Sequence, residues 1–268
     1  MLRVAFISFL VILSLTTVSA QLQEPVQKNG TVLLKTHWDQ FGPYARYAPD
    51  NHVLGCWSTA LAQIFYYHRL RPTGVVSYQC SKGYKIEDTL ANHTIAWDQF
   101  ATRIEPTTPH VAQDNVARFS YMTAEVIRKD FGTGSYLEMV NPVGQVNAYF
   151  PCQAEFYVSF TEPIPLSKEQ LAAIAQKENI QHVLQRDEVV KLIQREIDAK
   201  RPVYFHFGNF TTYGHSTVID GCQQENNTFW VHINYGAGGK RSGWYDLFKP
   251  IDVADDIKLR AFVTVKPN

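Results

Sequence analysis

The hydrophobic period of this chain changes at Pro202, and this change restricts the possible folds more than any other feature. Before Pro202, apolar residues recur at helical spacing, whereas after it short β-rich segments alternate with turn-forming residues. The expected strands span residues 203–207, 216–219, 229–233, 244–247 and 261–265. Helices followed by strands indicate an α+β fold of two lobes, one helical and one built on an antiparallel sheet.

Three amphipathic helices are expected before the sheet. The first begins near Cys56 and carries an apolar stripe as far as His68. The second spans about residues 115–129, and the third spans about residues 188–200 with Asp187 as its N-cap. Hydrophobic residues make up 45% of the chain, which is enough for a substantial core. Residues 21–268 are therefore expected to form one large domain, or two lobes, around a single cleft.

The first twenty residues have the layout of a secretory signal peptide. Arg3 gives a positive start, residues 4–15 are almost wholly apolar, and small residues precede a cleavage point after Ala20. The apolar run is shorter than the ~20 residues that a membrane span needs. The sequence therefore predicts a protein of the extracellular space, or of the lumen of the secretory or lysosomal pathway, that is free of the membrane after cleavage.

Glycosylation sequons agree with this route, and charge excludes two classes of partner. The sequons begin at Asn29, Asn92, Asn209 and Asn226, which predicts a glycoprotein. Lysine plus arginine and aspartate plus glutamate number 25 each. This balance gives no electrostatic basis for binding nucleic acid or an anionic membrane surface.

The cysteines allow two interpretations. Cys56, Cys80, Cys152 and Cys222 could form two structural disulfides, as is common in secreted proteins. Alternatively, one is a catalytic thiol and at most one disulfide forms. The context of Cys56 favours the second interpretation, and we then expect Cys80 to pair with Cys152 and Cys222 to stay free.

Cys56 follows Gly55 at the first turn of the first expected helix. Unpaired N–H groups and partial positive charge at a helix N-terminus stabilise a thiolate. Such surroundings, with a nearby imidazolium, lower a cysteine pKa from about 8.5 to roughly 3.5–7.5. Because the thiolate is the reactive species, Cys56 is the candidate nucleophile.

Among nine histidines, His215 is the candidate base. It follows a glycine at the start of an expected strand, and element ends are where a rigid frame presents catalytic groups. A base also needs a group that orients its second nitrogen. Asn234, at the end of the strand 229–233, is the candidate for that role, although it could equally be a plain turn residue before a glycine-rich loop.

Four blocks of sequence, in order along the chain, resemble the streptopain family of cysteine peptidases, over roughly residues 35–265. Residues 55–68 (GCWSTALAQIFYYH) resemble its nucleophile helix, and residues 214–221 (GHSTVIDG) resemble its histidine strand. Residues 232–239 (HINYGAGG), with GWY at 243–245, are similar to its Asn-Trp-Gly-Trp-Gly-Gly segment. Residues 38–44 (WDQFGPY) are similar to its short stretch upstream of the cysteine.

The resemblance implies a papain-like fold and hydrolysis of internal peptide bonds in proteins or peptides through a thioester acyl-enzyme. On matching positions it implies that Cys56 is the nucleophile and His215 the base and later acid. It also implies that Gln40 donates to the oxyanion together with the Cys56 backbone N–H, and that Asn234 orients His215. An oxyanion donor typically contributes about 10²–10³ in rate.

The sequence departs from the family pattern in three places. Tyr235 and Ala237 replace the two tryptophans of the glycine-rich segment, and the bulky Trp57 follows the nucleophile. Only about residues 21–35 precede the resembling region, which is too short for an inhibitory domain. The activity would then be inhibited by a separate protein, or by no part of this chain.

Other functions remain open at this point. The departures fit a catalytically weakened homologue that acts as a binding protein, and the same dyad would serve a thiol acyl-transferase or amidase. A metal site could be sought in His206, His215, Cys222 and His232. However, no His-Glu-x-x-His or paired Cys-x-x-Cys motif occurs, so neither a metal nor another cofactor is expected.

Overall fold

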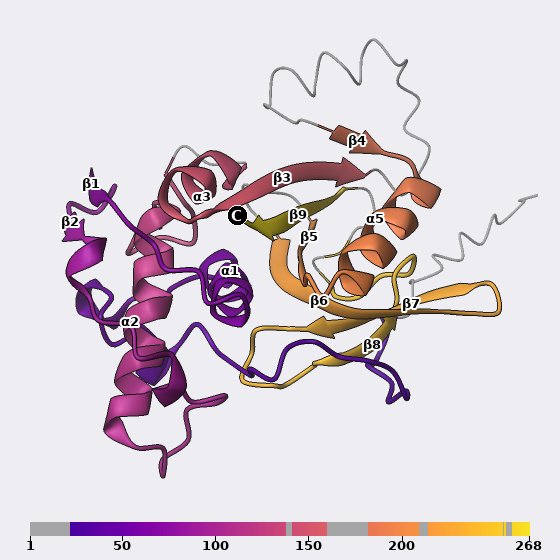
Figure 1. Cartoon of the computed structure of the whole chain (residues 1–268), viewed down its shortest axis with the longest axis horizontal. Helices are drawn as coiled ribbons and strands as arrows, with labels where there is room; N and C mark the ends of the chain where they lie inside the picture. The colour runs from indigo at the N-terminus through magenta and orange to yellow at the C-terminus, as the bar shows by residue number, and fades with distance from the viewer. Residues whose placement is uncertain (1–21, 138–140, 160–181, 209–213, 254, 256–258) are drawn as a thin grey trace, which may run out of the picture.

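A large mixed sheet is the centre of the fold in the computed structural model, which describes residues 22–137, 141–159, 182–208, 214–253, 255 and 259–268. Within this part, seven strands follow the order β4-β3-β9-β5-β6-β7-β8. Their bounds are β3 Cys152–Ser159, β4 His182–Leu184, β5 Val203–Gly208, β6 Gly214–Glu225, β7 Thr228–Asn234, β8 Gly243–Asp246 and β9 Arg260–Pro267. Figure 1 shows this sheet beside a lobe made of helices.

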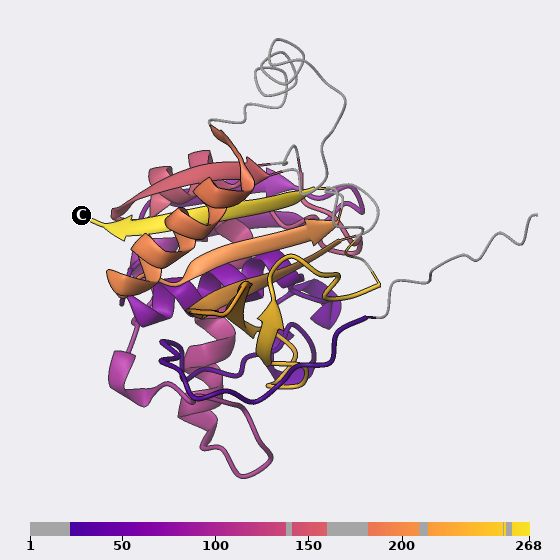
Figure 2. The ribbon, with the colours of Figure 1, turned by 90° about the vertical axis from the view of Figure 1, so that its right-hand side faces the viewer.

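The sheet separates two hydrophobic clusters because its side chains alternate between faces. On β5, Tyr204 joins the cluster under the helical lobe, whereas Phe205 and Phe207 join the cluster on the opposite face. On β9, Val263 joins the cluster under the helical lobe and Phe262 joins the cluster on the opposite face. In Figure 2, α5 (Arg186–Asp198) lies across the near face of the sheet and α1 (Cys56–Tyr67) lies behind it.

The helical lobe is built around α1, which is buried along most of its length. It packs against α2 (His110–Val126) and against β5 and β6 of the sheet. α3 (Val143–Tyr149), a small hairpin of β1 (Val75–Gln79) and β2 (Lys85–Thr89), and short 3₁₀ turns complete the lobe. Those turns are η1 Gly42–Ala45, η2 Pro49–Asn51, η3 Leu90–Asn92 and η4 Trp97–Gln99.

An aromatic cluster fixes the segment before α1 to this lobe. Trp38 is fully buried, and its ring centroid lies 5.1 Å from that of Tyr66 on α1 and 6.0 Å from that of Phe100. Its indole N–H donates to the Ala101 carbonyl at 2.9 Å. Aromatic pairs of this kind contribute about 0.5–1.5 kcal/mol beyond their buried area. Residues 37–40 are therefore held in a defined place beside α1.

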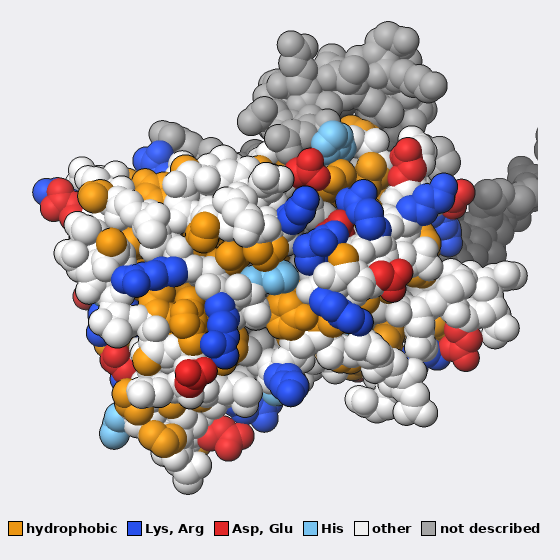
Figure 3. All heavy atoms as spheres, in the orientation of Figure 1, with side chains coloured by type: hydrophobic (Ala, Val, Ile, Leu, Met, Phe, Trp, Pro, Cys, Tyr) orange, Lys and Arg blue, Asp and Glu red, His pale blue; other side chains and the backbone are white. Residues whose placement is uncertain are grey.

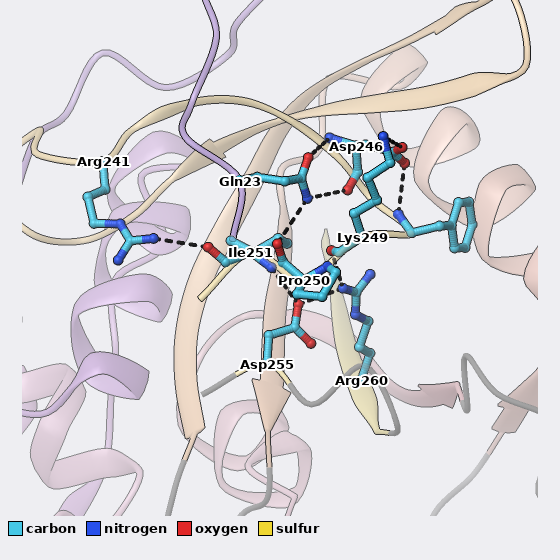
Figure 4. A network of polar contacts seen from close by, with 9 residues as sticks. Gln23, Arg241, Asp246, Lys249, Pro250, Ile251, Asp255 and Arg260 are labelled. Carbon is cyan, nitrogen blue, oxygen red and sulfur yellow. Dashed lines mark hydrogen bonds and ion pairs between the residues drawn. The ribbon is translucent and has the colours of Figure 1, made fainter. Parts of the chain in front are cut away.

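The residues before this segment cross the free edge of the sheet. Val26 and Trp244 of β8 exchange two backbone hydrogen bonds, of 3.0 and 3.1 Å. Gln23 extends the contact, because its side-chain amide donates to the Asp246 and Pro250 carbonyls and its side-chain oxygen accepts from the Asp246 N–H (Figure 4). This edge contact, which we call the N-terminal strap (residues 22–31), is part of the folded domain.

The predicted α+β organisation into a helical lobe and a sheet lobe is confirmed, with one correction to the sheet. Most neighbouring strands are antiparallel as expected, but β4 pairs with β3 in parallel. A parallel pair needs a crossover of about a dozen residues or more, and the connection 160–181 has that length. The expected signal peptide lies outside the described residues.

Charged side chains are interspersed rather than segregated on the face seen in Figure 3, in agreement with the equal numbers of acidic and basic residues. Among the helices that the structure describes, none combines the length and the apolar character of a membrane span.

Candidate active site

Cys56 is the first residue of α1 and is partly exposed. Gly55 precedes it as the N-cap, with φ of +89° and ψ of +149°. This conformation favours glycine, and a Cβ there would collide with the Tyr136 hydroxyl. The close approach of Tyr136 has a structural role, because its hydroxyl accepts a hydrogen bond from the Ser58 backbone N–H in the first turn of α1, at 3.2 Å. The sequence thus places a thiol at a helix N-terminus, as predicted.

The structure brings Cys56 and His215 into contact. His215 is the second residue of β6 and is partly exposed. Its ring forms a hydrogen bond with the Cys56 thiol. Its Nε2 lies 3.0 Å from the Tyr235 carbonyl oxygen, and the two ring centroids are 4.5 Å apart. One ring nitrogen therefore forms the hydrogen bond with the sulfur, and the other hydrogen-bonds to the backbone of the loop after β7.

The electrostatics of this pair favour separated charges. Burial alone would raise the pKa of the Cys56 thiol, but hydrogen bonding and positive charge from His215, with hydrogen bonds from Ser216, lower it below its usual value. Burial would lower the pKa of His215, but the Cys56 contact, the Tyr235 carbonyl and the charge of Asp252 raise it. A thiolate next to an imidazolium is the form that attacks carbonyl carbon.

The other three cysteines differ from Cys56 in both pKa and surroundings. Burial raises the pKa of Cys80, and it raises those of Cys152 and Cys222 to about 11. All four cysteines lie in the described part of the chain and are free thiols. The expected Cys80–Cys152 disulfide is therefore wrong for this structure: Cys80 instead directs its sulfur toward the Lys129 carbonyl, at 3.7 Å.

Asn234 does not take the place expected for it. Its side-chain amide donates to the Thr36 carbonyl at 2.6 Å and to Gln63 Oε1 at 3.1 Å, and its oxygen accepts from Gln63 Nε2 at 3.3 Å. The second nitrogen of His215 instead meets the carbonyl of the next residue, Tyr235. The sequence pointed to the correct turn, but a backbone group that no side-chain pattern reveals contacts the histidine.

The backbone of Gln40 contacts the segment that leads into α1 and Cys56. Its carbonyl accepts from the N–H of Leu54, two residues before Cys56, at 3.1 Å. The neighbouring segment is also tied to the glycine-rich loop, since the Gly238 N–H donates to the Trp38 carbonyl at 3.2 Å. No hydrogen bond between the Gln40 side chain and the Cys56–His215 pair is found in the described structure, so its predicted oxyanion role stays a prediction.

Trp57 is buried in the core, where its ring packs against other aromatic side chains. It is 5% exposed and stacks on Tyr136, with ring centroids 4.9 Å apart. Its edges meet Tyr204 and His206 of β5, at 6.3 and 5.8 Å. The departure from the small residue usual in the family is thus accommodated by aromatic packing between α1 and the sheet.

Sequence reasoning missed a buried lysine that interacts electrostatically with Cys56. Lys129 is fully buried and donates to three backbone carbonyls, those of Asp130, Thr133 and Ser135, at 3.2, 2.7 and 2.9 Å. Burial lowers its pKa to about 8, against the opposing charges of Asp130, Cys56 and Cys80. Its position after α2, far from Cys56 in sequence, carried no signal of this proximity.

Comparison with known proteins agrees with this geometry. The model of the Peptidase C10 family matches residues 38–245. A structure of a prointerpain A fragment from Prevotella intermedia covers 90% of this chain and 75% of its own, with a TM-score of 0.66 and 18% identity. The active wild-type interpain A cysteine protease of the same organism covers 88% of this chain and 98% of its own, with a TM-score of 0.63 and 20% identity. The papain-like fold is thereby confirmed. A search of curated proteins found no match.

Proposed function

The chain belongs to the Peptidase C10 family, the streptopain family that its motifs resemble, and is a cysteine peptidase; from this premise we propose that it is a secreted endopeptidase with Cys56 as nucleophile and His215 as base. One observation carries the assignment of the nucleophile. Of the four cysteines, only Cys56 has a lowered pKa, and its thiol bonds to a histidine.

The proposed reaction follows from the geometry of the pair. The Cys56 thiolate attacks the carbonyl carbon of a peptide bond, and the resulting oxyanion is stabilised by the Cys56 backbone N–H and the Gln40 side chain. The His215 imidazolium gives its proton to the leaving amine, which produces a thioester. His215 then takes a proton from water, whose oxygen attacks the thioester carbonyl carbon. The carboxyl product leaves, and the Cys56 thiolate and His215 imidazolium are regenerated. The Tyr235 carbonyl keeps the histidine ring oriented throughout.

Substitution of the two groups tests this assignment. We expect Cys56→Ala and His215→Ala to abolish cleavage of a denatured protein substrate while circular dichroism shows an unchanged fold. Cys222→Ala is the matched control, since this partly exposed thiol has a raised pKa of about 11 and should not contribute. Near-native turnover by Cys56→Ala or His215→Ala would refute the assignment.

Alkylation separates a peptidase from a weakened homologue. With iodoacetamide at neutral pH, mass spectrometry of the folded protein should find Cys56 modified and Cys80, Cys152 and Cys222 unmodified. An unreactive Cys56 would favour a binding protein without catalysis. If products containing an added amine accumulate in place of hydrolysed ends, the acyl group goes to amines and the chain acts as a transferase.

The oxyanion role of Gln40 has its own kinetic signature. Because the contact would form mainly in the transition state, Gln40→Ala should lower kcat about 10²-fold and change KM little. A loss confined to KM would instead assign Gln40 to substrate binding.

Secretion and glycosylation are supported by the sequence and by exposure. Asn29, Asn92 and Asn226, the sequon residues in the described part, are exposed. Expression in a eukaryotic secretory host should yield a medium-borne protein that begins at Gln21 and loses mass on treatment with an N-glycanase. An intracellular product that still carries residues 1–20 would contradict the proposal.

A further inference from the structure

Ser216, the residue after His215 on β6, lies in an unusually polar part of the core. It is 1% exposed and faces His206 in the β5–β6 register. Its Oγ lies 2.8 Å from the Tyr204 hydroxyl and 2.9 Å from His206 Nδ1. Trp57, next to the nucleophile, contacts both of these β5 rings. A serine hydroxyl in this environment has few orientations open to it.

Ser216 also acts on the sulfur. Because α1 packs directly against β6, Ser216 lies beside Cys56, and hydrogen bonding from its hydroxyl and its backbone N–H lowers the pKa of the Cys56 thiol. A hydroxyl has one hydrogen to donate and two lone pairs that accept. If the Tyr204 O–H and the His206 Nδ1–H occupy the two lone pairs, the hydrogen of Ser216 is left for the sulfur.

We propose that Ser216 is a second hydrogen-bond donor to the Cys56 thiolate, beside His215, and that Tyr204 and His206 are positioning residues that fix the direction of its hydroxyl. The inference rests on the proposed role of Cys56 as nucleophile and goes beyond the Cys–His pair. Ser216 is fixed on a strand and does not titrate, so its hydrogen bond to the thiolate does not depend on the protonation state of the His215 ring.

Other groups face the same sulfur and must stay constant in a test. His215 of β6 bonds to it, and Lys129 and Tyr136, from the loop after α2, interact with it electrostatically, as does Tyr204 of β5. The burial of Tyr204 raises its pKa well above the usual value, so its hydroxyl stays protonated and is able to donate to Ser216. Ser216→Ala removes one hydroxyl and leaves each of these groups in place.

The pH dependence of Cys56 alkylation in the full, processed protein is the measurement. Wild type should show a thiol pKa below the ordinary value. Ser216→Ala should raise that pKa by about 1 unit, as expected for loss of one hydrogen bond to a charged group, and slow alkylation about 10-fold at pH below the pKa. Tyr204→Phe should shift the pKa in the same direction by a smaller amount, because the Ser216 hydroxyl is then free to turn.

Thr217→Val is the matched control. This neighbouring hydroxyl is equally buried but bonds to the Phe205 carbonyl at 3.3 Å, so its removal should leave the thiol pKa unchanged. An unchanged pKa in Ser216→Ala, as would occur if Ser216 donated to His206 instead, overturns the inference, and so do equal shifts in the serine and threonine variants. If Ser216→Ala does not fold, the Cys56 thiol pKa of Tyr204→Phe tests the inference, and an unchanged value overturns it. A wild-type thiol with an ordinary pKa would refute the nucleophile assignment itself, which is a distinct result.

Discussion

At the residue scale, Gly55 is required by its backbone conformation and by a close contact. We predict that Gly55→Ala destabilises the protein by about 1–3 kcal/mol, because φ is +89° and the added Cβ would displace the Tyr136 hydroxyl from the start of α1. Denaturant unfolding measures the change. Gly144→Ala on α3 is the control, since a Cβ added there would meet no atom within 4 Å; equal stability of the two variants would contradict the argument.

Glu125 gives the fold an unusual pH dependence. It is 1% exposed on α2, and burial, with the nearby charge of Asp88, raises its pKa to about 9. The folded state therefore holds a proton that the unfolded state releases near pH 4.5, so stability falls as pH rises between these values. Glu125→Gln should remove this loss and become more stable than wild type by about 1–3 kcal/mol near pH 8.

Thermal unfolding of Glu125→Gln and wild type between pH 5 and about pH 9 checks this prediction. The difference should grow with pH. Glu87→Gln, at an exposed position on β2, should show a small and nearly constant difference. A gain in Glu125→Gln that is independent of pH would show that the carboxyl is ionised in the folded protein.

Among single residues, those with local signals were predictable and those with tertiary partners were not. Cys56 and His215 were found because a Gly-Cys at a helix start and a Gly-His at a strand start are visible in short windows. Their meeting in the structure agrees with that interpretation, although their roles stay predictions until tested. The Tyr235 carbonyl, Lys129 and Ser216 reach the site through backbone geometry or packing, which no spacing pattern records.

At the element scale, the Gln63–Asn234 amide pair joins α1 to the end of β7. Both side chains are buried and exchange two hydrogen bonds, and Gln63 Oε1 also accepts the Trp38 N–H at 3.3 Å. We predict that Asn234→Ala lowers stability by about 1–3 kcal/mol, because Gln63 and the Thr36 carbonyl lose buried partners. The alkaline limb of the kcat/KM profile should not move, since His215 keeps the Tyr235 carbonyl.

A double-mutant cycle separates this structural role from an orienting one. Gln63→Ala should cost a similar amount, and the double variant should cost less than the sum of the two. A shifted alkaline limb in Asn234→Ala but not in Gln63→Ala would restore Asn234 as the residue that orients His215.

The elements after Pro202 followed their predicted positions closely, because period-two patterns and turn residues bound short strands clearly. The bounds of β5, β7 and β8 lie within about a residue of the expected ranges, whereas β6 extends to Glu225, beyond its expected end. Before Pro202, α2 begins at His110, which precedes its expected start. Strand β3 and the β1–β2 hairpin were not predicted as strands. Their pairing depends on strands distant in sequence, such as β9 for β3, and such partners are not visible in a local window.

At the scale of the whole molecule, the N-terminal strap closes an edge that would otherwise be open. β8 ends the sheet order, and the strap supplies the backbone partner for Trp244. Glycines make this possible: a Cβ at Gly30 would collide with the Trp244 ring, and one at Gly221 would collide with the Thr31 carbonyl. The sequence alone suggested only an irregular lead-in, because the strap forms a single isolated bridge and has no strand pattern.

The strap also reaches a loop that contacts Tyr235, whose carbonyl contacts His215. Gln23 binds the Asp246 and Pro250 carbonyls, and two residues beyond Pro250 the carboxylate of Asp252 accepts from the Tyr235 hydroxyl and from Arg241 Nη1. The start of the folded domain is thus connected, through the 246–252 loop, to the residue whose carbonyl holds His215. Loss of the strap is therefore expected to affect both stability and turnover.

Val26→Pro tests the strap with a minimal change. Proline removes the N–H that bonds to the Trp244 carbonyl, which should cost about 1–2 kcal/mol and lower Tm by about 2–6 °C. An unpaired β8 edge should also promote association, seen as increased light scattering on warming. Val26→Ala is the control, because it keeps both backbone bonds and alters only a side chain that is 39% exposed. If both variants match wild type in Tm and scattering, the strap contributes no stability and the edge of the sheet is protected by other means.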